Sequence, residues 1–210
     1  TTFSVDAGNF TTAGAVETLA VSSTTAGATV TVGTMVAAAG LATLSVTGTN
    51  AAAVIGNVGS STAAPLLTSI TLVADEANAT VGTVDLTTAV AAGVANTITM
   101  SATSGDTAAI GAITGAAALN TITLNLSGAG TMTTGLISTF DLVVNAADTS
   151  GVVTVVGTTV ASAAVVELGS GTNTYTVGLG NDVITLKAGE GTDVIQMNTV
   201  DTAGDVYTIN

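Results

Sequence analysis

Short runs in which apolar residues alternate with Thr or Ser recur from Thr18 to Leu124. Apolar side chains at every second position are typical of a β-strand with one buried face and one solvated face. β-Branched Thr at the solvated positions favours an extended backbone without adding charge. We therefore predict strands at residues 18–21, 43–46, 69–72, 97–100 and 121–124.

A second element lies between these runs and keeps the same phase. It has an apolar-Gly-x-apolar core at residues 32–35, 55–58, 81–84 and 110–113, and Gly135 and Gly157 are expected to continue it. Two phased elements in each repeat indicate the coils of a solenoid, each stacked on the last. The predicted fold is all-β, a parallel β-solenoid (β-helix) with coils of about 25 residues. In this register Ile70, Ile98 and Ile122 occupy neighbouring coils.

A glycine-rich motif occurs three times between residues 168 and 196. In each copy a Gly-x-Gly pair is followed two residues later by Asn or Asp, and two residues after that by Tyr or Ile. The copies contain Gly169, Gly171 and Asn173, then Gly178, Gly180 and Asp182, then Gly189, Gly191 and Asp193. A fourth, partial copy begins at Asp205, where the sequence repeats that from Asp182. Glycines with positive φ allow carbonyl oxygens to converge, and the acid adds a hard oxygen ligand. Plain turns between strands are the alternative interpretation.

This motif resembles the nonapeptide G-G-x-G-x-D-x-U-x of the RTX family, with Leu168, Val177 and Ala188 in place of the first glycine. The resemblance implies that the chain ends in a calcium-binding β-roll, with solenoid repeats at residues 1–166 and the roll at residues 167–210. It implies Ca²⁺ as the cofactor, held by the glycines and acidic positions named above. Consecutive copies turn on opposite edges of such a roll, which stacks Asn173 on Asp193 and Asp182 on Asp205.

The charge balance excludes several classes of site. The chain has no His and no Cys, and Lys187 is its only basic residue against 14 Asp and Glu, a formal charge of −13. A Ser-His-Asp or Cys-His centre and a zinc site of the His/Cys type cannot be built. Binding to nucleic acid is not expected, because phosphates are recognised by clusters of Lys and Arg. The sequence also has no apolar run of about 18 residues that predicts a transmembrane helix.

The abundance of Thr, Ala, Gly, Val and Ser resembles the surface-layer and filamentous surface proteins of Gram-negative bacteria that carry RTX repeats. The resemblance implies a structural protein, not an enzyme, that is exported by a type I system and becomes ordered by calcium at the extracellular cell surface. Its expected partners are further copies of itself in a surface layer or filament, with cell-surface polysaccharide as a second candidate. Because the chain starts at Thr1 without an initiator Met, we expect it to be processed or part of a longer protein.

Two other functions remain compatible with the sequence. A spacer or adhesin segment of a large RTX protein would show the same repeats, although aromatic platforms for sugars are scarce. A polysaccharide-active β-helix enzyme is less favoured, because Lys187, Tyr175 and Tyr207 are the only residues of the types that usually handle sugar acids. The paired carboxylates of Asp75 and Glu76 could serve glycoside hydrolysis, but adjacent acids are more typical of a solvated loop.

Overall fold

The computed structural model describes residues 5–6, 17–37, 40–62, 67–86, 96–115, 121–138, 141–157, 163–187, 189, 191–197 and 204–210. These residues form β-strands and no helix, and the strands belong to three sheets. Sheet A consists of β1 (Val5–Asp6), β3 (Val30–Val32), β6 (Ala53–Ile55), β9 (Ala79–Val81), β12 (Thr107–Ile110), β15 (Thr131–Leu136), β17 (Val152–Val156), β19 (Thr172–Thr176) and β21 (Val194–Gln196). Sheet C consists of β2 (Thr18–Ser23), β5 (Thr43–Thr49), β8 (Ser69–Asp75), β11 (Asn96–Ala102), β14 (Thr121–Gly128), β16 (Asp141–Ala146), β18 (Ala164–Leu168), β20 (Val183–Leu186) and β22 (Val206–Ile209). The smaller sheet B consists of β4 (Met35–Ala37), β7 (Val58–Thr62), β10 (Val84–Leu86) and β13 (Ile113–Gly115).

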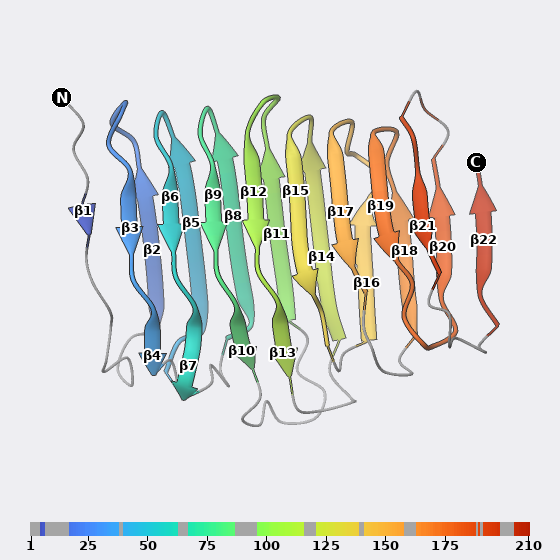
Figure 1. Cartoon of the computed structure of the whole chain (residues 1–210), viewed down its shortest axis with the longest axis horizontal. Helices are drawn as coiled ribbons and strands as arrows, with labels where there is room; N and C mark the ends of the chain where they lie inside the picture. The colour runs from blue at the N-terminus through green and yellow to red at the C-terminus, as the bar shows by residue number, and fades with distance from the viewer. Residues whose placement is uncertain are drawn as a thin grey trace.

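Each coil of the chain adds one strand to sheet C and then one strand to sheet A. Every pairing within the sheets is parallel, and the strands follow one another in chain order from β1 at one end of the molecule to β22 at the other (Figure 1). The sheets face each other across a shared interior. The structure is thus a parallel β-solenoid with coils about 24 residues apart, and the predicted fold class is confirmed.

The interior is built from the alternating apolar positions of the two large sheets. In β5 and β8 every second side chain is buried, as the alternation with Thr and Ser predicts. Parallel pairing places Leu44 beside Ile70 and Ile70 beside Ile98, so that side chains of one kind form columns along the molecule. The five strands predicted from the alternation all lie within strands of sheet C.

The register differs from the prediction at one step. Ile98 pairs with Leu124, whereas Ile122 pairs with Asn96, so the column continues two residues further along β14 than expected. A shift of two residues keeps the same side chains inside, because the side-chain period of a strand is two. Alternation alone therefore could not distinguish the two registers.

The glycine element is not one strand but two, joined at a bend. β3 ends at Val32 and β4 begins at Met35, and the same break recurs in the next three coils. A Cβ on Gly111 would lie 2.9 Å from the backbone carbon of Gly82, and a Cβ on Gly82 would lie 2.9 Å from that of Gly56. This glycine ladder, formed by Gly33, Gly56, Gly82, Gly111 and Gly135, lets successive bends stack closely.

The predicted extension of this element holds for only one of its two glycines. A Cβ on Gly135 would lie 2.7 Å from the nitrogen of Ala112, so Gly135 continues the ladder. Gly157 does not, because its nearest neighbours are Thr176 and the ring of Tyr175 on the next coil. Its missing side chain instead leaves room for the buried tyrosine.

Coil length changes where sheet B ends. In the early coils, paired residues of one inward column of sheet C are separated by the largest numbers of residues along the sequence. The members of this column there are Leu19, Leu44, Ile70, Ile98 and Leu124. Every later separation is smaller than any of these, through Val144, Val166, Ile184 and Tyr207. β13 is the last strand of sheet B among the described residues, and within these residues the later coils have strands in sheets A and C alone. This change precedes residue 166, and sheets A and C continue through that position without a break.

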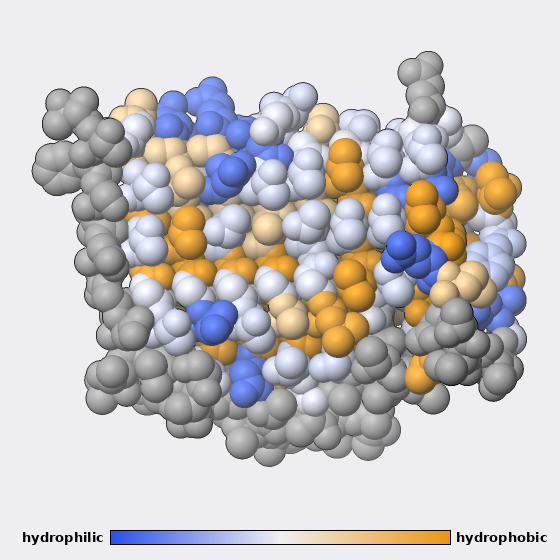
Figure 2. All heavy atoms as spheres, in the orientation of Figure 1, coloured by the Kyte–Doolittle hydropathy of each residue, from blue (hydrophilic) through white to orange (hydrophobic). Residues whose placement is uncertain are grey.

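The outer surface of sheet A carries few charges. Figure 2, which shows this side of the molecule, is dominated by pale residues of intermediate hydropathy, with scattered blue residues and with orange residues that gather toward the end of the late coils. Sheet C has an outer column that changes character along the molecule, and its members are Thr18, Thr43, Ser69, Thr97, Thr123, Val143, Val165, Val183 and Val206. In the part of the chain that is described, no helix has the length and apolar character needed to cross a membrane.

Candidate metal centre

Asn173 is the first inward-facing residue of β19, and Asp182, Asp193 and Asp205 directly precede β20, β21 and β22. In sheet A the column of inward side chains runs from Met132 to Val153 and then to Asn173. In sheet C it runs from Leu142 to Ala164, and Asp182 follows, since its neighbour Val183 pairs with Val165. In the preceding coils both columns are apolar, apart from Asn96 in sheet C. The candidate centre is therefore a region where the edges of the interior become polar.

Asn173 and Asp193 meet on one edge, as predicted. The side-chain amide nitrogen of Asn173 donates to Oδ1 of Asp193 at 2.7 Å and to the carbonyl oxygens of Gly169 and Gly171, each at 3.0 Å. Asn173 is completely buried, and Asp193 is half-buried. The first and third glycine motifs thus form one stacked pair, which we call the Asn173 edge.

Asp182 and Asp205 meet on the opposite edge, which is also as predicted. The backbone N–H of Asp182 donates to Oδ1 of Asp205 at 2.9 Å. The carboxylate of Asp182 is completely buried and accepts hydrogen bonds from the backbone N–H groups of Ala164 at 2.9 Å and Gly178 at 3.0 Å. We call this pair the Asp182 edge. The Asp182 edge has two acidic side chains, whereas the Asn173 edge has one.

The negative charge of the Asp182 edge acts on a buried tyrosine. Tyr175 is 0% exposed, and its hydroxyl has no hydrogen-bond partner among the described residues. Burial raises the pKa of Tyr175 far above its usual value near 10, and the charges of Asp182 and Asp205 raise this pKa further. Both carboxylates therefore raise the pKa of the same buried hydroxyl. Sequence reasoning placed this tyrosine in the repeat but missed its electrostatic environment.

The motif glycines serve close packing between coils, and the predicted role of positive φ is wrong for those of the Asn173 edge. Gly169, Gly171, Gly189 and Gly191 do not adopt positive φ. A Cβ on Gly171 would lie 1.9 Å from the carbonyl oxygen of Gly151, and one on Gly191 would lie 2.0 Å from that of Gly171. Stacked turns approach too closely for any side chain at these positions.

Sequence reasoning missed two further features of the turns. Gly130 and Gly151 precede Gly171 and Gly191 in one column, so the close turn packing begins before the glycine motifs do. At the other edge, Oδ1 of Asn181 accepts the backbone N–H of Gly204 at 2.9 Å. The signal for this contact was the repeated position of Asn181 and Gly204 directly before Asp182 and Asp205. Residues 201–203, where the fourth copy departs from the motif, lie outside the described residues.

The two edges differ in how well they fit calcium. At the Asp182 edge the two stacked turns supply two carboxylates, which are hard oxygen ligands of the kind that calcium prefers. At the Asn173 edge three oxygen atoms converge on one place, but an N–H donor of Asn173 already occupies it. The Asp182 edge therefore fits a cation by donor chemistry and charge, and the Asn173 edge as it stands does not. No cluster of three or more acidic side chains, the usual core of a metal site, occurs in the described ranges.

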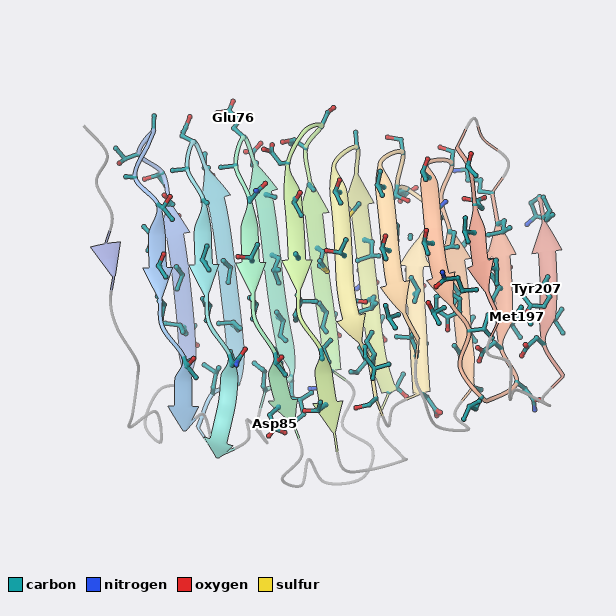
Figure 3. All side chains as sticks on the ribbon, viewed as in Figure 1. Glu76, Asp85, Met197 and Tyr207 are labelled. Carbon is teal, nitrogen blue, oxygen red and sulfur yellow. The ribbon has the colours of Figure 1, made fainter. Side chains whose placement is uncertain are left out.

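Other chemically active residues lie away from these edges. Asp75 ends β8 and Glu76 follows it with a φ of 64°, and both side chains are exposed. Figure 3 shows Glu76 at the turn above β8 and Asp85 at the opposite end of the coil, on β10. Figure 3 also shows Met197 and Tyr207 together near β22, where the tyrosine hydroxyl lies 2.9 Å from the sulfur of Met197 and 3.0 Å from Oδ2 of Asp205.

Comparisons with known proteins give no further information about this arrangement. No protein-family model, no curated protein and no solved structure matches the chain. The conclusions about function therefore depend on the sequence patterns and on the geometry described above.

Proposed function

We propose that the chain is a structural segment of an extracellular bacterial surface protein that assembles with copies of itself in the presence of calcium. The observation that carries the proposal is the stacking of paired acidic turns at the edge of a regular parallel solenoid. Such a solenoid offers long, repetitive surfaces and, at its ends, strand edges that can pair with another chain. The family resemblance of the glycine motifs, described above, favours the same function.

Charge supplies the physical reason for a calcium requirement. With 14 acidic residues and Lys187 as the only basic side chain, two copies of the chain repel one another. Bound calcium would contribute positive charge at the acidic turns, which lowers this repulsion. In this proposal the carboxylates of Asp182 and Asp205 hold the ion. The buried contacts of Asp182 with Ala164 and Gly178 fix the position of its carboxylate.

Light scattering at fixed ionic strength tests the proposal. We expect assembly in millimolar calcium, dispersal by EGTA and recovery when calcium is added again. Monovalent salt should not replace calcium, because it screens charge without binding between carboxylates. A chain that stays monomeric in millimolar calcium contradicts the proposal and favours the alternative function, a spacer or adhesin segment of a larger protein.

Matched variants locate the effect. Asp182→Asn combined with Asp205→Asn removes two charges with little change in shape, and we expect it to abolish the calcium response. Asp75→Asn combined with Glu76→Gln removes two charges from an exposed turn and should leave the response intact. Circular dichroism of each variant establishes that it is folded. An equal loss in both pairs would point to general charge repulsion instead of a site at the Asp182 edge.

Calorimetry with calcium and magnesium tests the ion itself. Magnesium requires a near-ideal octahedral shell and gives up its water reluctantly, so it should bind these turns poorly. Equal affinity for the two ions would contradict a calcium site at the Asp182 edge.

A further inference from the structure

The buried amide of Asn173 lies where three oxygen atoms converge. Its nitrogen is 3.0 Å from the carbonyl oxygen of Gly169, 3.0 Å from that of Gly171 and 2.7 Å from Oδ1 of Asp193. An amide nitrogen carries two protons and can only donate, so both protons are directed at these acceptors. Oδ1 of Asn173 is buried and has no partner within the described residues. The side chain is thus oriented entirely by its donor end.

Three oxygens in such a position need a positive centre between them. Two carry the partial negative charge of carbonyl groups, and Asp193 carries a full charge, so they repel one another at short range. A metal ion can supply the positive centre, and so can N–H protons. Here the protons of Asn173 supply it, and they do so from a side chain that the strand itself holds in place through the pairing of β19 with β17 and β21.

We infer that Asn173 is a built-in substitute for a cation, so that the Asn173 edge closes without metal. At the Asn173 edge the amide of Asn173 donates to the carboxylate of Asp193 across the two turns, whereas at the Asp182 edge both stacked side chains are carboxylates. The inference refines the proposed function, because it assigns the calcium requirement to one edge only. It depends on local contacts, and its test does not require the chain to assemble.

Hydrogen exchange of the full chain, followed by mass spectrometry, tests the inference. In the wild type we expect the amides of residues 169–176 to exchange at the same rate in EGTA and in millimolar calcium. Faster exchange of these amides in EGTA would overturn the inference, and this arm of the experiment needs no variant.

Asn173→Asp provides the second arm. The substitution removes both protons and places a second carboxylate beside Asp193 and the two carbonyl groups. We expect exchange of the same amides in EGTA to accelerate by about a hundredfold, as for an uncompensated buried charge, and millimolar calcium to restore protection. Protection equal to the wild type in EGTA would overturn the inference.

Asn145→Asp is the matched control. Asn145 is exposed on the outer face of sheet C, and its amide donates to Oδ1 of Asn125 at 2.9 Å. The same change of charge there should create no calcium dependence at residues 169–176. If Asn145→Asp also made exchange at residues 169–176 depend on calcium, the effect would come from added charge and not from the position of Asn173. If calcium causes no increase in light scattering, the proposed function is contradicted. The exchange results at the Asn173 edge still test the inference, because they do not require assembly.

Discussion

The coils before β14 and the coils from β14 onward close in different ways. The earlier coils use more of the chain for each step of the stack, and sheet B gives them a third strand. The later coils take shorter steps and have strands only in sheets A and C within the described residues. The inward columns are apolar in the first region, apart from Ser23 and Asn96, and acquire Thr134, Asn173 and Asp182 in the second.

This difference shows how one solenoid can change its means of stabilisation along its length. A coil with three strands encloses more apolar side chains, and burial of apolar surface is its main source of stability. A coil with two strands has a narrower interior and fewer side chains to bury. Its edges are instead closed by hydrogen-bonded turns and, at the Asp182 edge, by the proposed ion. The outer column of sheet C shifts in parallel, from Thr and Ser to exposed Val165, Val183 and Val206.

A carboxylate placed in the interior of the first region should have the largest effect. Ile98 is 1% exposed between Ile70 and Leu124, so Ile98→Asp buries a charge without a partner and should cost about 3 to 5 kcal/mol, enough to unfold the chain or break the solenoid. Thr99→Asp points to solvent and should be tolerated. Urea unfolding followed by circular dichroism measures both variants. Similar losses would mean that the two faces of the strand do not differ in tolerance of charge.

The glycine ladder allows an intermediate test. Gly111→Ala places a methyl group 2.9 to 3.0 Å from backbone atoms of Gly82 and Thr83, and such overpacking should cost about 1 to 3 kcal/mol. Gly204→Ala is the control, because the nearest atom to its Cβ would be 3.8 Å away. Thermal unfolding compares the two. Equal melting temperatures would show that the bends of the first region are more deformable than their close stacking suggests.

Alkaline pH should act on the second region through Tyr175. Its pKa is raised in the folded chain, so above pH 10 the unfolded state releases this proton while the folded state keeps it. Stability is therefore complete below pH 10 and should fall by about 1.4 kcal/mol per pH unit above it. Tyr175→Phe should flatten this slope, and Tyr207→Phe should not. Urea titrations at several pH values measure the slope, and an unchanged slope in Tyr175→Phe would place the pH effect elsewhere.

The outer column of sheet C should give the smallest effect. Val183 is 40% exposed, and Val183→Thr restores the residue type that the first region has in this column. We expect a change in stability within about 0.5 kcal/mol, as for most surface substitutions. A loss of several kcal/mol, measured by urea unfolding, would show that the valines of the second region are packing residues instead of surface residues.

The sequence predicted the strands and the solenoid because alternation of apolar and polar residues reports directly on burial. It could not choose between Ile122 and Leu124 as the partner of Ile98, since both are inward positions of one strand. The bend between β3 and β4 did leave a signal. Val32 and Met35 are both buried although Met35 follows Val32 by three residues. In a single straight strand with a side-chain period of two, residues at this spacing lie on opposite faces.

At the candidate site, repetition of the motif predicted which turns stack. The donor that closes the Asn173 edge was not predictable in this way, because the motif treats Asn and Asp as equivalent. Only the geometry shows that the amide protons of Asn173 lie among three oxygens. The role of Gly157 beside Tyr175 was equally hidden, because spacing along the chain does not reveal which coil a missing side chain accommodates.

The glycine ladder has a consequence for how this chain can evolve. Its members are unevenly spaced along the sequence, at positions 33, 56, 82, 111 and 135, yet from the second member onward each would touch the preceding bend if it carried a side chain. The differences in length between coils are therefore accommodated elsewhere in the coil. A duplicated coil can join the stack only if it has a glycine at the same bend, whereas the length of the rest of the coil can vary.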